Sequence, residues 1–209
     1  MVAMGYTQVE GVDYDQTFAS VMTTKSFRIL LAIWNNFPNL KFEHWDVKTA
    51  FVNAPLKETV FCHQVAGFEK VGTEGQVLRL RKALYGTKQA AHAWQQFLCK
   101  ILLDLGAKRH PKDECIYIFR EREKEEKSES FLFLGTHVDD LFPLCNEGGE
   151  KIKLRILGEL KRHMQNKGTL SFALERNINR GTLKISQTAY IKNLLKEYNM
   201  ESATACPPR

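Results

Sequence analysis

The sequence predicts an α+β fold in which helices pack on a central, largely antiparallel sheet. Apolar residues recur at helical spacing in some segments and alternate or cluster over short stretches in others. The two kinds of segment do not alternate regularly, and pairs of strand-like segments follow one another as hairpins. That order favours antiparallel pairing over a parallel sheet built from strand–helix–strand units.

Four segments are predicted as helices from their apolar periodicity. They are residues 26–35, 88–105, 148–164 and 190–198. Ser26 is a suitable N-cap for the first helix, Pro38 prevents its continuation, and Gly106 ends the second. A short helix or turn is expected at residues 49–53, closed by Pro55.

Strands are predicted where apolar residues alternate or run together between turn residues. They are residues 39–46, 76–84, 115–120, 131–136 and 141–145, with a further hairpin formed by 170–174 and 182–185 around 179–181. The mixed-charge run at residues 120–127 is typical of a solvated hairpin loop. Residues 1–20 are predicted as loop and short strand because they are rich in turn formers.

The composition is that of a soluble globular domain, with 44% hydrophobic and 26% charged residues in a chain of 209. Its apolar stretches are far shorter than the roughly 20 residues that span a bilayer. The first residues lack the pattern of a secretory signal, so we expect an intracellular protein. The five cysteines form no C-x-x-C pair, which favours reduced thiols over a zinc site or a disulfide framework.

A formal net charge of +6 suits a polyanionic partner such as nucleic acid. Many basic proteins bind no nucleic acid, so the charge alone does not decide the partner.

Asp139 and Asp140 form the most informative local feature, an acidic pair between two apolar strand segments. Aspartate is a favoured turn residue, and the pair alone is compatible with a simple turn. Asp46 at the end of the strand predicted at 39–46 adds a third carboxylate. If the two strands are neighbours, these groups converge into the hard-oxygen site that Mg²⁺ prefers. Phe51, five residues further on, is either a core aromatic or a contact for a nucleotide sugar.

Six segments together resemble the reverse transcriptase of copia-type retrotransposons over residues 2–200. The segments are 2–8 (VAMGYTQ), 11–14 (GVDY), 46–51 (DVKTAF), 84–89 (LYGTKQ), 138–140 (VDD) and 185–191 (ISQTAYI). Each is weak alone, but their order and spacing are specific. The resemblance implies a fingers-palm fold with a central antiparallel sheet packed on helices, and RNA-directed DNA polymerase activity.

The resemblance also implies the residue roles. Asp46, Asp139 and Asp140 become the catalytic and metal-binding residues for two Mg²⁺ ions, with Mn²⁺ as a substitute. Phe51 becomes the residue that selects deoxynucleotides. The remaining nucleotide-binding residues implied are Tyr85, Gly86, Lys88 and Gln89, and those implied near primer and template are Ala91, His92, His137 and Val138. The implied ligands are an RNA or DNA template, a primer and deoxynucleotide triphosphates.

The chain departs from the family pattern beside the predicted site. His137 stands where tyrosine is usual, and Ala91-His92 replaces a Pro-Arg pair, which removes a permanent positive charge. Two functions therefore stay open: an Mg²⁺-dependent polymerase, or a decayed or co-opted domain that binds nucleic acid without synthesis. An unrelated metal-dependent nuclease does not explain the polymerase segments.

The expected organisation is a fingers and palm domain at residues 1–200, beginning inside the fingers, with residues 201–209 as the start of a thumb or linker. The resemblance places such a domain in a polyprotein beside integrase and ribonuclease H domains. It also implies a cytoplasmic virus-like particle, with the nucleus as the alternative location.

Overall fold

The structure is a computed structural model that describes residues 2–73, 75–122, 129–160, 164–169, 172–173, 176–179, 181 and 183–203. Its helical elements are η1 (Gly5–Thr7), α1 (Thr24–Asn36), η2 (Ala50–Asn53), α2 (Ala90–Asp104), α3 (Gly149–Leu160) and α4 (Thr188–Glu197). Its strands are β1 (Lys41–Val47), β2 (Pro55–His63), β3 (Val77–Lys82), β4 (Lys108–His110), β5 (Asp113–Glu121), β6 (Ser130–His137), β7 (Asp140–Cys145), β8 (Met164–Thr169), β9 (Phe172–Ala173), β10 (Arg176–Asn179) and β11 (Lys184–Ser186).

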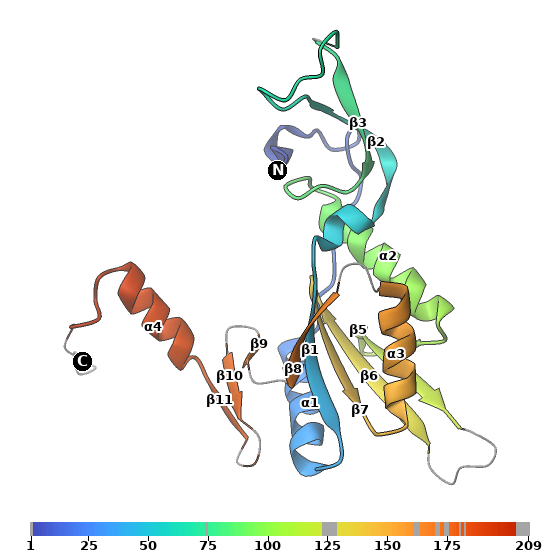
Figure 1. Cartoon of the computed structure of the whole chain (residues 1–209), viewed down its shortest axis with the longest axis vertical. Coiled ribbons are helices and arrows are strands. Elements are labelled where there is room, and N and C mark those ends of the chain that lie inside the picture. Colours follow the sequence, from blue (N-terminus) through green and yellow to red (C-terminus); the bar gives the residue numbers. More distant parts are fainter. Residues whose placement is uncertain are drawn as a thin grey trace.

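A six-stranded sheet forms the body of the molecule, in the order β4-β5-β6-β7-β1-β8 (Figure 1). Every pairing in it is antiparallel. β1 lies between β7 and β8, although roughly a hundred residues separate it from either in the sequence. The α+β class and the antiparallel sheet predicted from the sequence are therefore confirmed.

Helices cover both faces of this sheet, and each face has its own hydrophobic cluster. On one face, α2 and α3 pack over side chains such as Trp45 and Leu141. On the other, α1 packs over Phe42, Phe142 and Leu144. The two clusters alternate along β1 because successive side chains of a strand point to opposite faces. Even-numbered positions of β1 therefore share the α1 face.

The predicted first helix is confirmed, but its N-cap is Thr23 and not Ser26. The Thr23 hydroxyl accepts a hydrogen bond from the backbone N–H of Ser26 at 3.1 Å. Ser26 lies inside the first turn, where that N–H would otherwise have no acceptor. The buried side of α1 consists of Phe27, Leu30, Leu31 and Trp34.

A two-stranded hairpin of β2 and β3 extends from one end of the sheet, with the N-terminal segment beside it (Figure 1). The sequence analysis predicted β3 and missed β2. Of the nine residues of β2 only Val60 is buried, so the strand lacks the apolar pattern that would have identified it. Its pairing with β3 defines it instead.

The C-terminal part required two further corrections. The helix predicted at 148–164 ends at Leu160, and Met164 begins β8, where it pairs with Val47 of β1. In the predicted hairpin, the strand facing β11 is β10 and not residues 170–174, of which Phe172 and Ala173 form the third strand β9.

α4 lies away from the main sheet and has no buried residue (Figure 1). Within the described part of the chain, no helix is long and apolar enough to cross a membrane. Most of the mixed-charge run predicted as a loop, residues 123–127, lies outside the described residues.

A small ion-pair network connects α3 to β1. The Lys153 ammonium lies 2.6 Å from a Glu43 carboxylate oxygen and also contacts Glu150. Burial lowers the pKa of Lys153, but the two carboxylates outweigh it and the pKa lies above the ordinary lysine value. Burial also raises the pKa of Glu150, and the contacts with Lys153 and Lys41 reverse this and lower it. The buried charge is therefore stabilised by its partners.

Replacing Lys153 with methionine removes the shared cation and leaves two carboxylates close together. We expect a loss of roughly 2–3 kcal/mol in the free energy of unfolding, measured by urea denaturation at pH 7. Lys192→Met, at an exposed position of α4, should change it by less than about 0.5 kcal/mol.

The pH dependence of that loss follows from the two pKa shifts. Because the pKa of Glu150 is lowered, its contribution to the free energy of unfolding is fully present at pH values above its ordinary pKa of 4.5. This contribution is lost as the pH falls through the lowered pKa of the folded state. Because the pKa of Lys153 is raised, its contribution to the free energy of unfolding is fully present at pH values below its ordinary pKa of 10.5. This contribution is lost as the pH rises through the raised pKa of the folded state. The stability difference between wild type and Lys153→Met should shrink below pH 4.5. A difference that grows there would contradict this network.

Candidate functional site

Asp46 and Asp140 face each other across the β1–β7 pairing. They are direct partners in the antiparallel register, next to the pair formed by Trp45 and Leu141. Directly opposed residues of an antiparallel pair point to the same face of the sheet. The structure thus brings together two of the predicted aspartates that lie far apart in the sequence.

Asp139 belongs to the tight turn that joins β6 to β7. Val138 in this turn has a positive φ of 54°, a left-handed conformation that is costly for a β-branched residue. Two hydrogen bonds stabilise the turn: Trp94 Nε1 donates to the Val138 carbonyl at 2.9 Å, and the Val47 N–H donates to the Asp139 carbonyl at 2.9 Å. The turn is therefore held by α2 on one side and by β1 on the other.

The Asp139 carboxylate is partly withdrawn from solvent. Its Oδ2 accepts a hydrogen bond from the Tyr85 hydroxyl at 3.2 Å, while its Oδ1 is buried and has no hydrogen-bond partner among the described residues. Burial raises the pKa of Asp139, as do the neighbouring charges of Asp140 and Asp46, against the opposing effect of the Tyr85 bond. Burial and the Asp139 charge likewise raise the pKa of Tyr85.

This arrangement fits a hard divalent cation at Asp46 and Asp139. A buried carboxylate oxygen without a donor is costly unless a proton or a cation satisfies it. Two like charges near Asp139 add to that cost, and a cation bound between the carboxylates would offset it. Asp140 differs, because one of its oxygens lies 2.6 Å from His44 Nε2. In the described residues, no three histidine, cysteine or acidic side chains are already gathered around a metal position.

Phe51 and Tyr85 form an aromatic pair beside the aspartates. Their ring centroids lie 4.5 Å apart with the rings stacked. Phe51 is in the short helix η2 that follows β1, and Tyr85 follows β3. Tyr85 therefore contacts both the ring of Phe51 and the carboxylate of Asp139, and it connects these two predicted site residues.

Gly86 and Gln89 join the predicted nucleotide-binding loop to the N-terminal segment. Gly86 has a φ of 92°, and a Cβ there would lie 2.1 Å from the Ala3 carbonyl oxygen, so only glycine fits. Gln89 is 1% exposed, and its amide bonds to Gln8 and to the Asp13 carbonyl. The Lys88 backbone N–H donates to the Gln8 side chain at 2.7 Å. The sequence analysis missed the role of Gln8, for which its place in segment 2–8 was the one signal.

The residues predicted near primer and template occupy separate positions. Val138 and Ala91 both line a small cavity of about 90 Å³ next to the aspartate turn. His137 is the partner of Asp140 in the β6–β7 register, and its buried Nδ1 has no hydrogen-bond partner among the described residues. His92 lies on the other side of α2, where its Nδ1 is 2.6 Å from the Phe18 carbonyl oxygen.

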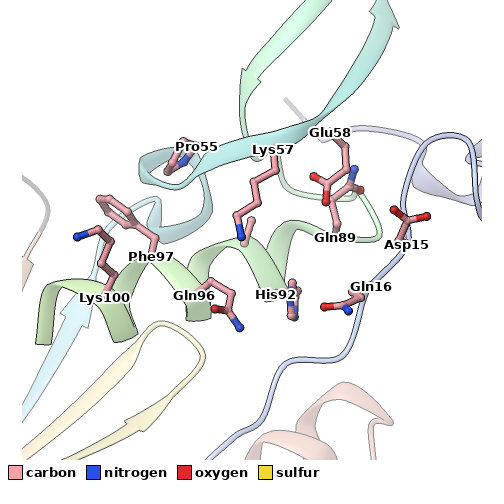
Figure 2. Close-up of a pocket in the computed structure, with 11 residues that line it drawn as sticks. Asp15, Gln16, Pro55, Lys57, Glu58, Gln89, His92, Gln96, Phe97 and Lys100 are labelled. Carbon is pink, nitrogen blue, oxygen red and sulfur yellow. The ribbon is translucent and has the colours of Figure 1, made fainter. Parts of the chain in front are cut away.

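A larger cavity, of about 380 Å³, lies between the N-terminal segment, β2 and α2. Figure 2 shows Lys57 directed from β2 toward α2, which carries His92, and Asp15 on the N-terminal segment. Glu58 and Gln89 also line it, and the cavity carries both signs of charge through Lys57, Asp15 and Glu58. The three aspartates are absent from its described lining residues, and the cavity is therefore distinct from the aspartate site.

The sequence pattern of the family described as reverse transcriptase (RNA-dependent DNA polymerase) matches residues 1–208. This chain belongs to the reverse transcriptase family. The predicted resemblance to copia-type retrotransposon reverse transcriptases is thereby confirmed, and so is the interpretation of this chain as a retrotransposon Pol sequence.

The reverse transcriptase chain is similar to Pol polyproteins of plant transposons. The retrovirus-related Pol polyprotein from transposon TNT 1-94 of Nicotiana tabacum is 30% identical over 209 residues, which is 97% of this chain and 15% of that protein. That from transposon RE1 of Arabidopsis thaliana is 31% identical over 211 residues, covering 97% of this chain and 14% of that protein. The chain thus spans about a seventh of the length of these relatives. No solved structure shows a significant match.

The left-handed conformation of Val138 predicts an inverted order of two substitutions. At most positions alanine is more favourable than glycine, but at a positive φ the Cβ costs about 1–2 kcal/mol. We expect Val138→Gly to unfold at a higher temperature than Val138→Ala, measured by circular dichroism. Both variants lose the valine side chain, so the comparison isolates the backbone. A more stable alanine variant would show that the turn is not strained in solution.

Proposed function

We propose that this chain is the RNA-directed DNA polymerase domain of a copia-type retrotransposon. The reaction is attack by a primer 3′-hydroxyl on the α-phosphorus of a deoxynucleotide triphosphate. The observation that carries the proposal is the β1–β7 register, which puts Asp46 opposite Asp140 and beside Asp139 in a member of the reverse transcriptase family. Convergent carboxylates at this point suit magnesium-dependent phosphoryl-type transfer.

Asp46 and Asp139 are the residues that would hold two Mg²⁺ ions, with Mn²⁺ as a substitute. Bound there, the ions would lower the pKa of the primer hydroxyl and stabilise charge on the departing pyrophosphate. The Oδ1 of Asp139, which has no hydrogen-bond partner in the described part of the chain, supports this assignment. The Tyr85 hydroxyl orients the other oxygen of the same carboxylate, and no protein nucleophile is required.

Phe51 is proposed as the residue that selects deoxynucleotides. Its ring is held by stacking on Tyr85, which is itself hydrogen-bonded to Asp139. A rigid aromatic ring close to the metal-binding carboxylates is suited to contact the sugar of an incoming nucleotide. Gly86 and Lys88 are proposed to contact the nucleotide, and Gln89 to support their loop from its buried position.

The proposed partners are an RNA or DNA template, a primer and deoxynucleotide triphosphates, in keeping with the net charge of +6. Integrase and ribonuclease H domains of the same polyprotein are proposed as neighbours, in a cytoplasmic virus-like particle. Within this proposal, residues 1–200 form fingers and palm, and residues 201–209 begin a thumb or linker.

A second candidate function is nucleic-acid binding without synthesis. The observation that favours it is His137, which departs from the family pattern and pairs with Asp140 in the β6–β7 register beside the aspartate turn. Ala91-His92, which also depart from the pattern, lie in the first turn of α2. A domain with this history would keep the fold and the positive charge while losing catalysis.

Primer extension with Mg²⁺ separates the two functions. Asp139→Asn should lower the extension rate at least about 100-fold, because a metal-binding carboxylate contributes several kcal/mol to catalysis. Asp104→Asn, at an exposed position of α2, is the matched control and should extend primers like wild type. Equal, background-level extension by wild type and Asp139→Asn, together with salt-dependent binding of primer–template, would establish the binding function instead.

Nucleotide selection provides an independent test. Phe51→Ala should raise the use of ribonucleotides relative to deoxynucleotides by roughly tenfold or more, because the ring that would clash with a 2′-hydroxyl is gone. Phe97→Ala, a partly buried aromatic of α2 at the other cavity, should leave the ratio unchanged. An unchanged ratio in Phe51→Ala would remove Phe51 from the proposed site.

A further inference from the structure

His44 is the residue next to the aspartates whose contacts the proposed reaction does not use. It lies on β1 two positions before Asp46, so both side chains point to the same face of the sheet. Asp140 lies opposite Asp46, and the His44 ring reaches it diagonally. The His44 Nε2 to Asp140 Oδ1 distance is 2.6 Å.

The His44 ring is fixed by packing as well as by this bond. It is 9% exposed and stacks on Phe142, with ring centroids 5.1 Å apart and an interplanar angle of 20°. Phe142 is itself fully buried under α1. In this contact the Nε2–H of His44 is the donor and a carboxylate oxygen of Asp140 is the acceptor. A buried donor packed against Phe142 therefore holds an acidic side chain that is 31% exposed.

This contact determines which oxygen of Asp140 remains available. With Oδ1 occupied by His44, Oδ2 is the atom left for the face shared with Asp46. Carboxylates that bind metals are commonly oriented by hydrogen bonds of this kind, and losing such a partner typically weakens metal binding about 10–100-fold.

We propose that His44 is a positioning residue of the metal site, which acts by holding Asp140 through Oδ1 so that Oδ2 faces the cation position beside Asp46. This inference rests on the proposed function, because it presumes that the aspartates bind a divalent cation. It assigns to His44 a role different from that of an ordinary core residue. A core residue would contribute through its stacking on Phe142, whereas a positioning residue contributes through its N–H.

Two substitutions separate the N–H from the ring. His44→Gln supplies an amide donor at a similar reach but loses the stacking. His44→Phe keeps an aromatic ring against Phe142 but has no donor. Mn²⁺ affinity is measured from the electron paramagnetic resonance signal of the free ion, and stability from thermal unfolding of the same preparations. Asp139→Asn defines how much of the Mn²⁺ binding belongs to the aspartate site.

We expect His44→Phe to weaken Mn²⁺ binding by about tenfold or more, and His44→Gln to stay within about threefold of wild type. The order of stability should be the reverse, with His44→Gln unfolding at the lower temperature. If Mn²⁺ affinity instead follows stability, or is unchanged in His44→Phe while Asp139→Asn loses the site, His44 is a core residue and the inference is overturned. If Asp139→Asn binds Mn²⁺ like wild type, the proposed function fails and this inference fails with it.

Discussion

The antiparallel register between β1 and β7 places Asp46 opposite Asp140, and the turn before β7 adds Asp139 to the same end of the sheet. A shift of one residue would turn Asp46 to the face of α2 and α3 and bring Trp45 to the face of α1. The alternating burial of β1 opposes such a shift, because Trp45 and Phe42 fill different hydrophobic clusters. Packing of the two faces therefore fixes the position of the carboxylates.

The aspartate turn is stabilised by its surroundings in spite of its own chemistry. Val138 has a left-handed backbone, and the Asp139 carboxylate is partly buried beside two other acidic residues. Both features cost free energy, and such features gather at functional sites where the rest of the fold supports them. Here the support consists of the Trp94 and Val47 hydrogen bonds and the buried strands on either side.

Contacts distant in sequence also assemble the rest of the site. The N-terminal segment packs against the loop after β3, with Gly86 in close approach to Ala3 and Gln8 bonded to Gln89. That loop supplies Tyr85, which contacts both Phe51 and Asp139. Five of the six segments that carry the family resemblance are thus neighbours in space, whereas residues 185–191 belong to β11 and α4, away from the main sheet (Figure 1). Family membership and the geometry of the aspartates lead to the same proposed reaction, while the contact between His44 and Asp140 is a feature of this chain's own side chains.

The sequence by itself determined the α+β class, three of the four main helices within a few residues, and the three aspartates as the candidate site. These predictions depend on local apolar periodicity and on short motifs, which can be recognised without knowing the spatial neighbours of a segment. Only the tertiary structure decided that Met164 begins a strand, that β2 exists, that Gln8 supports the loop after β3 and that His44 contacts Asp140. Each of these features depends on contacts with a segment that is distant in the sequence. A local sequence pattern does not indicate which segments become neighbours in the fold.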